Sequence, residues 1–195
     1  MTVAPSAPRY SGKCCILALT LGHRPLIGGG YTTQVHIREY TEADWPAVWS
    51  IFQDVVTTGD TFPYDPAWSA DQAHAVWVQP PPYHTVVACE GAEILGTAHM
   101  GRNRPSPGAH VATASFMVAG EARGQGVGRA LSEYALTWAR EQGFAAMQFN
   151  AVVESNTAAV RLYQTLGFQV IGTVPQAFKH PRLGLVGLHV MHCFL

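Results

Sequence analysis

The residues with the clearest chemical meaning form one short run, Arg123 to Gly128, which reads Arg-Gly-Gln-Gly-Val-Gly. An apolar run typical of a strand, residues 114–119, precedes it, and an amphipathic helix is expected to follow. The first amides of a helix lack intrahelical acceptors and lie at the positive end of its dipole, so such a junction can bind an anion. Glycines allow close approach of the backbone, and a guanidinium suits phosphate. The run therefore predicts a phosphate-binding turn.

The spacing of the glycines excludes two common phosphate-binding loops. A dinucleotide-binding loop needs a third glycine where this chain has Arg129. A P-loop needs Gly-Lys followed by Ser or Thr, a tripeptide that the sequence lacks. The pattern that fits is Arg-x-x-Gly-x-Gly, at Arg123, Gly126 and Gly128.

A second pattern follows about thirty residues further along the chain. Residues 127–142 have one apolar face at helical spacing and end at Gly143, and residues 145–153 are typical of a buried strand. A second helix is expected to open at Ser155-Asn156 and to end at Gly167-Phe168. Residues 156–168 read Asn-x-x-Ala-x-x-x-Tyr-x-x-x-Gly-Phe.

Together, the two motifs resemble those of the GNAT family of N-acetyltransferases, and the resemblance covers roughly residues 35–195. It implies acetyl-CoA as co-substrate and no metal. It also implies that the main chain of Phe116 and Val118 pairs with the pantetheine arm, and that an N–H near Met117 or Val118 polarises the acetyl carbonyl. The implied cofactor-binding residues are Phe116, Met117, Val118, Arg123, Gly124, Gln125, Gly126, Val127, Gly128, Arg129, Asn156 and Tyr163.

The same resemblance gives two side chains a role in the reaction. Asn156 would bind the pantetheine, and Tyr163, seven residues later on the same helical face, would donate a proton to the departing sulfur. The alternative for Tyr163 is a core tyrosine whose hydroxyl reaches the surface. Because the four cysteines lie outside both motifs, direct attack by the amine is expected rather than an acyl-enzyme.

The general base is harder to assign, because residues 111–119 contain no carboxylate. Glu154 lies just after the second strand, and Asp60 lies in a loop on the expected substrate side. His99 and His110 lie near strand ends, and each is also a reasonable structural residue. A chain of water molecules to the solvent is an equal alternative. The predicted catalytic residues are Tyr163, Asn150 and Glu154.

Asn150 is a polar residue inside an otherwise apolar strand, and a buried amide needs partners. It could pair where two central strands separate, or it could contact the substrate. Residues 149–156, Phe-Asn-x-Val-x-Glu-x-Asn, resemble the fungal azetidine-2-carboxylate N-acetyltransferases, in which the strand asparagine helps to hold a cyclic amino acid. That resemblance departs after Val174, where residues 176–181 differ from the substrate-side loop of those enzymes.

A second candidate wall of the substrate site is the loop around Asp60, Phe62 and Tyr64. The two aromatic rings could form an apolar slot, and the carboxylate could hold a cationic amine; a plain surface turn is the alternative. The positive group for a substrate carboxylate could come from Lys179, His180 or Arg182. A small amine such as an amino acid or its analogue is favoured over a protein or peptide acceptor, and a non-catalytic CoA-binding sensor is the alternative from another class.

Composition limits the remaining possibilities. The 195 residues are 48% apolar and carry a formal net charge of −1, with no basic field that would indicate nucleic acid. Because no apolar run has the length of a membrane span, no membrane association and a cytoplasmic location are expected. The cysteines show no metal-binding spacing. The apolar stretch Leu185 to Leu195 offers an edge for a homodimer.

The order of the expected elements predicts an α/β fold. Residues 1–34 are interpreted as an extension, which could be either disordered or an added edge segment. Residues 35–195 are interpreted as one acetyltransferase domain. Strands are expected at 35–39, 85–90, 94–100, 111–119, 145–153, 169–174 and 185–193, with helices at 41–56, from Ser69 to before Gln79, at 127–142 and at 155–167. The resemblance adds a mixed, mostly antiparallel sheet flanked by helices, whose central strands splay at the acetyl-CoA site.

Overall fold

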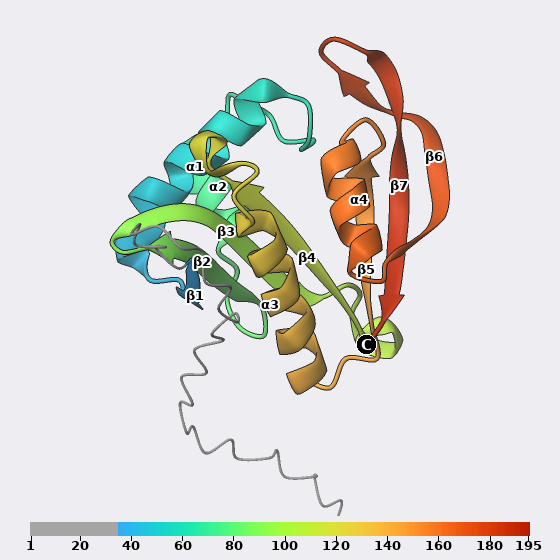
Figure 1. The fold of residues 1–195 in the computed structure, drawn as a ribbon, viewed down its shortest axis with the longest axis horizontal. Coiled ribbons are helices and arrows are strands. Elements are labelled where there is room, and N and C mark those ends of the chain that lie inside the picture. Colours follow the sequence, from blue (N-terminus) through green and yellow to red (C-terminus); the bar gives the residue numbers. More distant parts are fainter. Residues whose placement is uncertain (1–34) are drawn as a thin grey trace, which may run out of the picture. The chain divides into compact units, whose positions relative to one another are not determined.

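The computed structural model describes residues 35–195, which are built around a seven-stranded sheet (Figure 1). The predicted extension, residues 1–34, lies outside the described residues. The strands follow the order β1-β2-β3-β4-β5-β7-β6, and every neighbouring pair is antiparallel except β4 and β5. Their bounds are β1 His36–Glu39, β2 His84–Glu90, β3 Glu93–Arg102, β4 Val111–Val118, β5 Ala146–Val153, β6 Gln169–His180 and β7 Gly184–Phe194.

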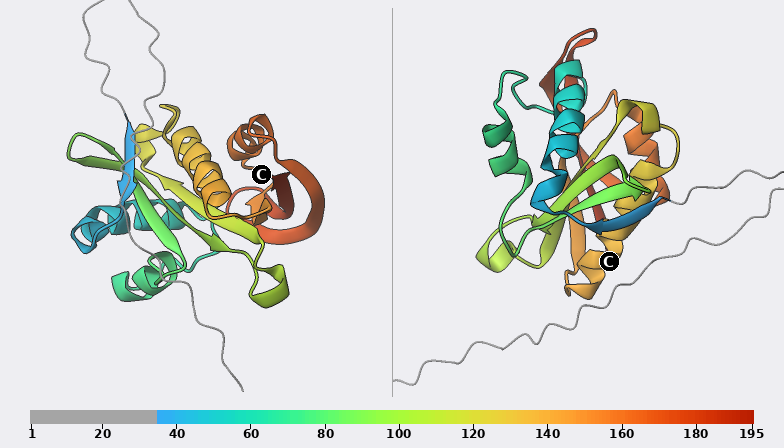
Figure 2. Two further views of the ribbon diagram at one scale, coloured as in Figure 1. Left: turned by 90° about the horizontal axis from the view of Figure 1, so that it is seen from below. Right: turned by 90° about the vertical axis from the view of Figure 1, so that its left-hand side faces the viewer.

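Helices cover both faces of this sheet (Figure 2). The α-helices are α1 Trp45–Thr58, α2 Ala70–Trp77, α3 Val127–Glu141 and α4 Thr157–Thr165, and short 3-10 turns are η1 Glu42–Asp44, η2 Ser106–Gly108 and η3 Gly120–Ala122. Two adjacent residues of β3, Gly96 and Thr97, show which helix covers which face, because successive side chains of a strand point to opposite sides of the sheet. The Thr97 hydroxyl accepts a hydrogen bond from Trp77 of α2, at 3.1 Å. A Cβ placed on Gly96 would lie 3.0 Å from Val127 of α3, so α3 packs closely against the other face.

The predicted elements are confirmed, with one difference of extent. Ser69 caps α2 through a reciprocal capping box with Gln72, and Gly143 follows α3 with a φ of 78°. β6, however, does not end at Val174 as expected but continues to His180. Its pairing with β7 is interrupted between residues 174 and 178, and Gln176 has a φ of 53° there. No helix within residues 35–195 is long and apolar enough to cross a membrane.

The central strands β4 and β5 separate, as expected. Their parallel pairing consists of two residue pairs, Val111 with Ala146 and Ala112 with Met147. β4 continues to pair with β3 as far as Val118, while β5 continues along β7. Beyond Ala112, the edge of β4 that faces β5 therefore has no strand partner.

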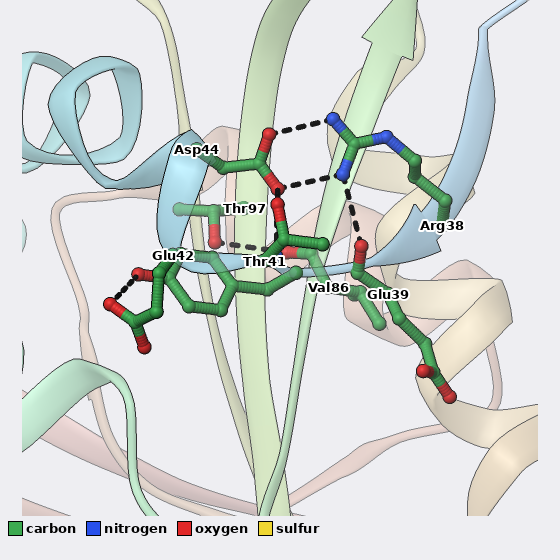
Figure 3. A network of polar contacts seen from close by, with 8 residues as sticks. Arg38, Glu39, Thr41, Glu42, Asp44, Val86 and Thr97 are labelled. Atoms are coloured by element: carbon green, nitrogen blue, oxygen red, sulfur yellow. Dashed lines mark hydrogen bonds and ion pairs between the residues drawn. The ribbon is translucent and has the colours of Figure 1, made fainter.

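A partly buried ion pair ties β1 to the start of α1 (Figure 3). Arg38 donates two hydrogen bonds of 2.7 Å to the two carboxylate oxygens of Asp44, and Asp44 is 7% exposed. The amide and hydroxyl of Thr41 donate to the same carboxylate at 2.8 and 3.0 Å. The hydrogen bonds from Arg38 lower the pKa of Asp44 to about 2, and those from Thr41 act in the same direction.

Replacing Asp44 by Asn should destabilise the fold by about 1–3 kcal/mol at pH 7, because the substitution removes a charge-assisted bidentate pair and leaves Arg38 without its anion. The carboxyl has a depressed pKa in the folded state. Its contribution is therefore complete above the unfolded value of about 4 and is lost as the pH falls toward about 2. Urea denaturation of wild type and Asp44→Asn between pH 7 and pH 3 measures the difference. A gap that stays constant over this range would contradict the assignment.

Candidate active site

A cavity of about 990 Å³ is lined by residues from both sides of the separated strands. Residues 113–118 of β4 and 149–153 of β5 form part of its wall. The turn that opens α3 and the start of α4 line it, and so do residues 60–64, which follow α1, and the β6–β7 turn. Because α1 and α3 cover opposite faces of the sheet, a cavity that both elements help to line passes through the gap between β4 and β5.

The turn before α3 has the geometry of an anion site. Gly124 and Gly126 have φ values of 79° and 87°, in the left-handed region that favours glycine, and a Cβ placed on either residue would meet no other atom within 4 Å. Val127 and Gly128 begin the helix, so their amides have no intrahelical acceptor. Neither amide donates to a turn or loop carbonyl within residues 35–195. The amide of Gly128, a residue that lines the cavity, is therefore available to a ligand.

Most of the predicted cofactor-binding residues line the cavity, and two do not. Gln125 is turned away, and its side-chain amide donates to the carbonyl of Glu121 at 2.7 Å. Val127 is 1% exposed and packs in the core. Arg129 lines the cavity and also donates to Glu133 and to Thr165 of α4, at 3.2 and 3.0 Å. The cavity-lining members of the predicted set are Phe116, Met117, Val118, Arg123, Gly124, Gly126, Gly128, Arg129, Asn156 and Tyr163.

The start of α4 brings Asn156 and Tyr163 to the same cavity. Asn156 is the N-cap, and its side-chain oxygen accepts a hydrogen bond from the amide of Ala159 at 3.2 Å. The ring of Tyr163 packs against Phe149 of β5 at 4.6 Å and against Phe116 of β4 at 6.1 Å. Burial raises the pKa of Tyr163 well above its usual value, so the phenol keeps its proton at neutral pH.

Comparison with known proteins identifies this arrangement. Residues 44–168 match the model of the acetyltransferase (GNAT) family. The chain belongs to this family. A GCN5-related N-acetyltransferase from Kribbella flavida has the same fold, with a TM-score of 0.81 and 54% identity over 83% of this chain and 98% of that one.

Two curated relatives differ in how much of their length is matched. The L-methionine sulfoximine/L-methionine sulfone acetyltransferase of Pseudomonas aeruginosa is 33% identical over 150 residues, which are 72% of this chain and 83% of that protein. Protein SPT10 of Saccharomyces cerevisiae is 34% identical over 89 residues, 46% of this chain, and the match spans 13% of its length. The GNAT chain is accordingly an acyltransferase.

In this GNAT chain, Asn150 is exposed, which corrects the expectation of a buried amide. It lies where the pairing of β5 with β7 is interrupted, between Phe149 and Val152, and it lines the cavity. Its amide nitrogen donates to Asn103 at 2.7 Å, and its oxygen accepts from Gln148 at 2.8 Å. The structure therefore supports the first alternative, pairing where the strands separate, and substrate contact by Asn150 stays a prediction.

The predicted base candidates are placed very differently. Glu154 does not line the cavity; its carboxylate accepts a hydrogen bond of 2.5 Å from the amide of Gly187 and so ties β5 to β7. His110 does not line the cavity either, and its Nδ1 lies 3.1 Å from the carbonyl of Pro107. Both ring nitrogens of His99 are enclosed without a partner in the described chain, and burial lowers its pKa to about 4. Among the described residues that line the cavity, Asp60 is the single carboxylate.

The predicted substrate loop does reach the cavity. Asp60, Phe62 and Tyr64 line it, and Asp60 accepts a 2.6 Å hydrogen bond from Thr58. The rings of Phe62 and Tyr64 stack at 5.6 Å. From the other hairpin, His180 and Arg182 line the cavity, whereas Lys179 does not.

Sequence reasoning missed two polar residues of β4, Thr113 and Ser115, which also line the cavity. They alternate with alanines in an apolar strand. This period of two places both polar side chains on one face of the strand, and it was the signal by which they could have been found.

The position of Glu154 leads to a prediction that separates a strand tie from a general base. Glu154→Gln keeps an oxygen that can accept from Gly187, so we expect kcat to stay within about 3-fold, whereas loss of a general base costs about 100-fold or more. Glu154→Ala should instead lower stability by about 1–3 kcal/mol, because the Gly187 amide loses its acceptor. Steady-state kinetics and thermal unfolding of both variants check this. A large loss of kcat in a stable Glu154→Gln variant would restore the role of base.

Proposed function

We propose that the GNAT chain is an acetyl-CoA-dependent N-acetyltransferase that transfers the acetyl group directly to the amine of a small molecule, with an amino acid or amino-acid analogue favoured. The observation that carries this proposal is the cavity through the gap between β4 and β5, which joins an anion-binding turn to a loop with one carboxylate and two aromatic rings. Acyl transfer needs both partners in one site, and this cavity offers hydrogen-bond donors for the anion of one partner and a carboxylate acceptor for the amine of the other.

The residues present fit acetyl-CoA. The orphan amide of Gly128, with the guanidinium of Arg123, suits its pyrophosphate. The unpaired edge of β4 at Phe116 and Val118 offers main-chain groups for the pantetheine arm, as an added strand would use them. When bound, acetyl-CoA supplies the acetyl thioester. An amide near Met117 or Val118 would then stabilise negative charge on the carbonyl oxygen.

Two proton movements are proposed. Tyr163 would give its proton to the departing thiolate; burial raises the pKa of its phenol, so the group is protonated at neutral pH and has a proton to give. The proton of the amine would leave toward water or toward Asp60. This carboxylate belongs to residues 60–64, which we call the acceptor loop. Direct attack by the amine needs no nucleophile from the protein; the two described cysteines, Cys89 and Cys193, are buried, and neither lines the cavity.

Three features support a small acceptor. The stacked rings of Phe62 and Tyr64 form an apolar wall, Asp60 can hold a cationic amine, and Arg182 can face an anionic group. The name of the Pseudomonas aeruginosa relative, which acts on amino-acid analogues, agrees with this.

We further propose a cytoplasmic location and a homodimer. The large exposed apolar side chains of residues 35–195 all lie on β6, β7 or their turn: Val170, Ile171, Val174, Leu183, Leu185 and Phe194.

Release of CoA thiol from acetyl-CoA, measured against a panel of amines, tests the proposed function. The panel contains L-methionine sulfone, L-methionine sulfoximine, phosphinothricin, L-azetidine-2-carboxylate, ordinary amino acids, polyamines, aminoglycosides and N-terminal peptides. We expect turnover to be highest with the amino-acid analogues, because the acceptor loop offers groups of both charges. Highest turnover with the peptides would favour the protein-acetylating alternative. Acetyl-CoA binding without thiol release from any amine would favour a sensor and contradict the proposal.

Tyr163→Phe tests the proton donor. Because the substitution keeps the ring that packs on Phe149 and removes the hydroxyl, we expect kcat to fall about 100-fold or more with little change in the KM for acetyl-CoA. The control is an acetyl thioester of a thiol that is more acidic than CoA. Because its thiolate needs less help from a proton donor, it should recover much of the lost rate. An unchanged kcat would leave Tyr163 as a core tyrosine.

A further inference from the structure

His180 is the buried side chain of the acceptor side that the proposed reaction does not use. It ends β6, is 6% exposed and lines the cavity. Two serines with enclosed hydroxyls also line the cavity. The hydroxyl of Ser132 donates to the carbonyl of Gly128 at 2.8 Å, and that of Ser155 has no partner among the described residues. A buried polar atom without a hydrogen-bond partner is costly, so the partner of each ring nitrogen of His180 matters.

One nitrogen of His180 holds the β6–β7 turn. Its Nδ1 accepts hydrogen bonds from the backbone amides of Arg182 and Leu183, at 3.1 and 3.3 Å. A nitrogen that accepts two amide hydrogens carries no proton of its own, so the ring proton lies on Nε2. The turn therefore selects one tautomer and makes Nε2–H a hydrogen-bond donor.

The second nitrogen, Nε2, is not fully enclosed by the described residues. Among side-chain nitrogens of residues 35–195, those enclosed without a partner belong to His99, and Nε2 of His180 is not one of them. No described residue accepts a hydrogen bond from Nε2. Because His180 lines the cavity, a ligand bound there is the partner that we expect for this donor.

The surroundings of His180 place the donor beside the predicted acceptor loop. The next residue, Pro181, approaches Gly59 at the end of α1, and a Cβ on Gly59 would lie 3.8 Å from its ring. Asp60 is the residue after Gly59, so the β6–β7 turn lies beside the start of the acceptor loop. Arg182, which also lines the cavity, forms no ion pair within the described residues.

We infer that His180 is a specificity-determining residue: its Nε2–H, together with the Arg182 guanidinium, binds the carboxylate of an α-amino acid acceptor. The inference rests on the proposed function and names the part of the acceptor that this site recognises. A neutral N–H donor and a guanidinium satisfy a carboxylate without burying a second full charge. A simple amine has no group for these two donors, and the site therefore discriminates against it.

Two substitutions separate the nitrogens of His180. His180→Asn keeps an oxygen near the position of Nδ1, which can hold the turn, but has no donor at the position of Nε2. His180→Gln places an amide near Nε2 but removes the acceptor for the turn. Lys179→Gln is the matched control, since Lys179 precedes His180, is exposed and does not line the cavity.

The experiment compares ligands that differ by one carboxylate. Calorimetric titration in the presence of CoA would use L-methionine sulfone with 3-(methylsulfonyl)propylamine, and L-azetidine-2-carboxylate with azetidine. We expect the wild type to prefer the amino acid of at least one pair. In His180→Asn the affinity for that amino acid should fall about 10–100-fold, the effect of losing a hydrogen bond to a charged group, while the affinity for the amine stays nearly unchanged. His180→Gln should keep most of the preference and unfold at a lower temperature.

The outcomes distinguish this inference from the proposed function. Equal weakening of amino acid and amine in His180→Asn, or an effect of Lys179→Gln as large as that of His180→Asn, would overturn the inference. So would a wild type that binds neither amino acid, or that binds each amine as well as its amino acid. Carboxylate-dependent binding without thiol release from acetyl-CoA would retain the inference and reject the transferase proposal.

Discussion

The separation of β4 from β5 is the constraint on which the rest of the site depends. Two strands that pair at only two positions leave main-chain donors and acceptors unpaired at the centre of a sheet, where such groups are costly unless a ligand or water satisfies them. Aromatic rings stabilise the separated arrangement. Phe149 of β5 stacks on Phe168 at 4.3 Å and meets Phe116 of β4 edge-on at 5.8 Å, so ring packing replaces part of the missing backbone ladder.

Side-chain hydrogen bonds fix the walls on both sides of this gap. Glu154 joins β5 to β7 through the amide of Gly187, and Arg129 joins α3 to α4 through the hydroxyl of Thr165. Asn150 reaches Asn103 across the region where the strands part. Each tie connects elements that the sheet ladder alone does not hold together at that point. A cavity that crosses a sheet needs such ties, because every unpaired strand edge would otherwise be free to move.

The parts of the fold that the sequence predicted well are those with local causes. The reciprocal cap at Ser69, the glycine that ends α3 and the apolar period of the strands act over a few residues, and they placed nearly every element. The turn proposed to bind an anion was readable for the same reason, since its glycines, arginine and helix start are contiguous. The continuation of β6 to His180 was not readable, because Pro175 is typical of a strand end and because pairing resumes only after the irregular backbone at Gln176, against the partner strand β7.

Side-chain direction near the gap depends on irregular pairing, which sequence spacing does not encode. An interruption in a ladder changes which face the following residues present, so the interruption between Phe149 and Val152 exposes Asn150 and helps to decide where Glu154 points. The prediction treated β5 as a regular buried strand and therefore assigned Asn150 an enclosed amide and Glu154 a place near the chemistry. For His180 the obstacle was different: its tautomer follows from two backbone amides that reach it only after the turn has formed. The positions of residues in contiguous motifs could be found from the sequence, whereas residues oriented by a distant strand or by a completed turn needed the structure.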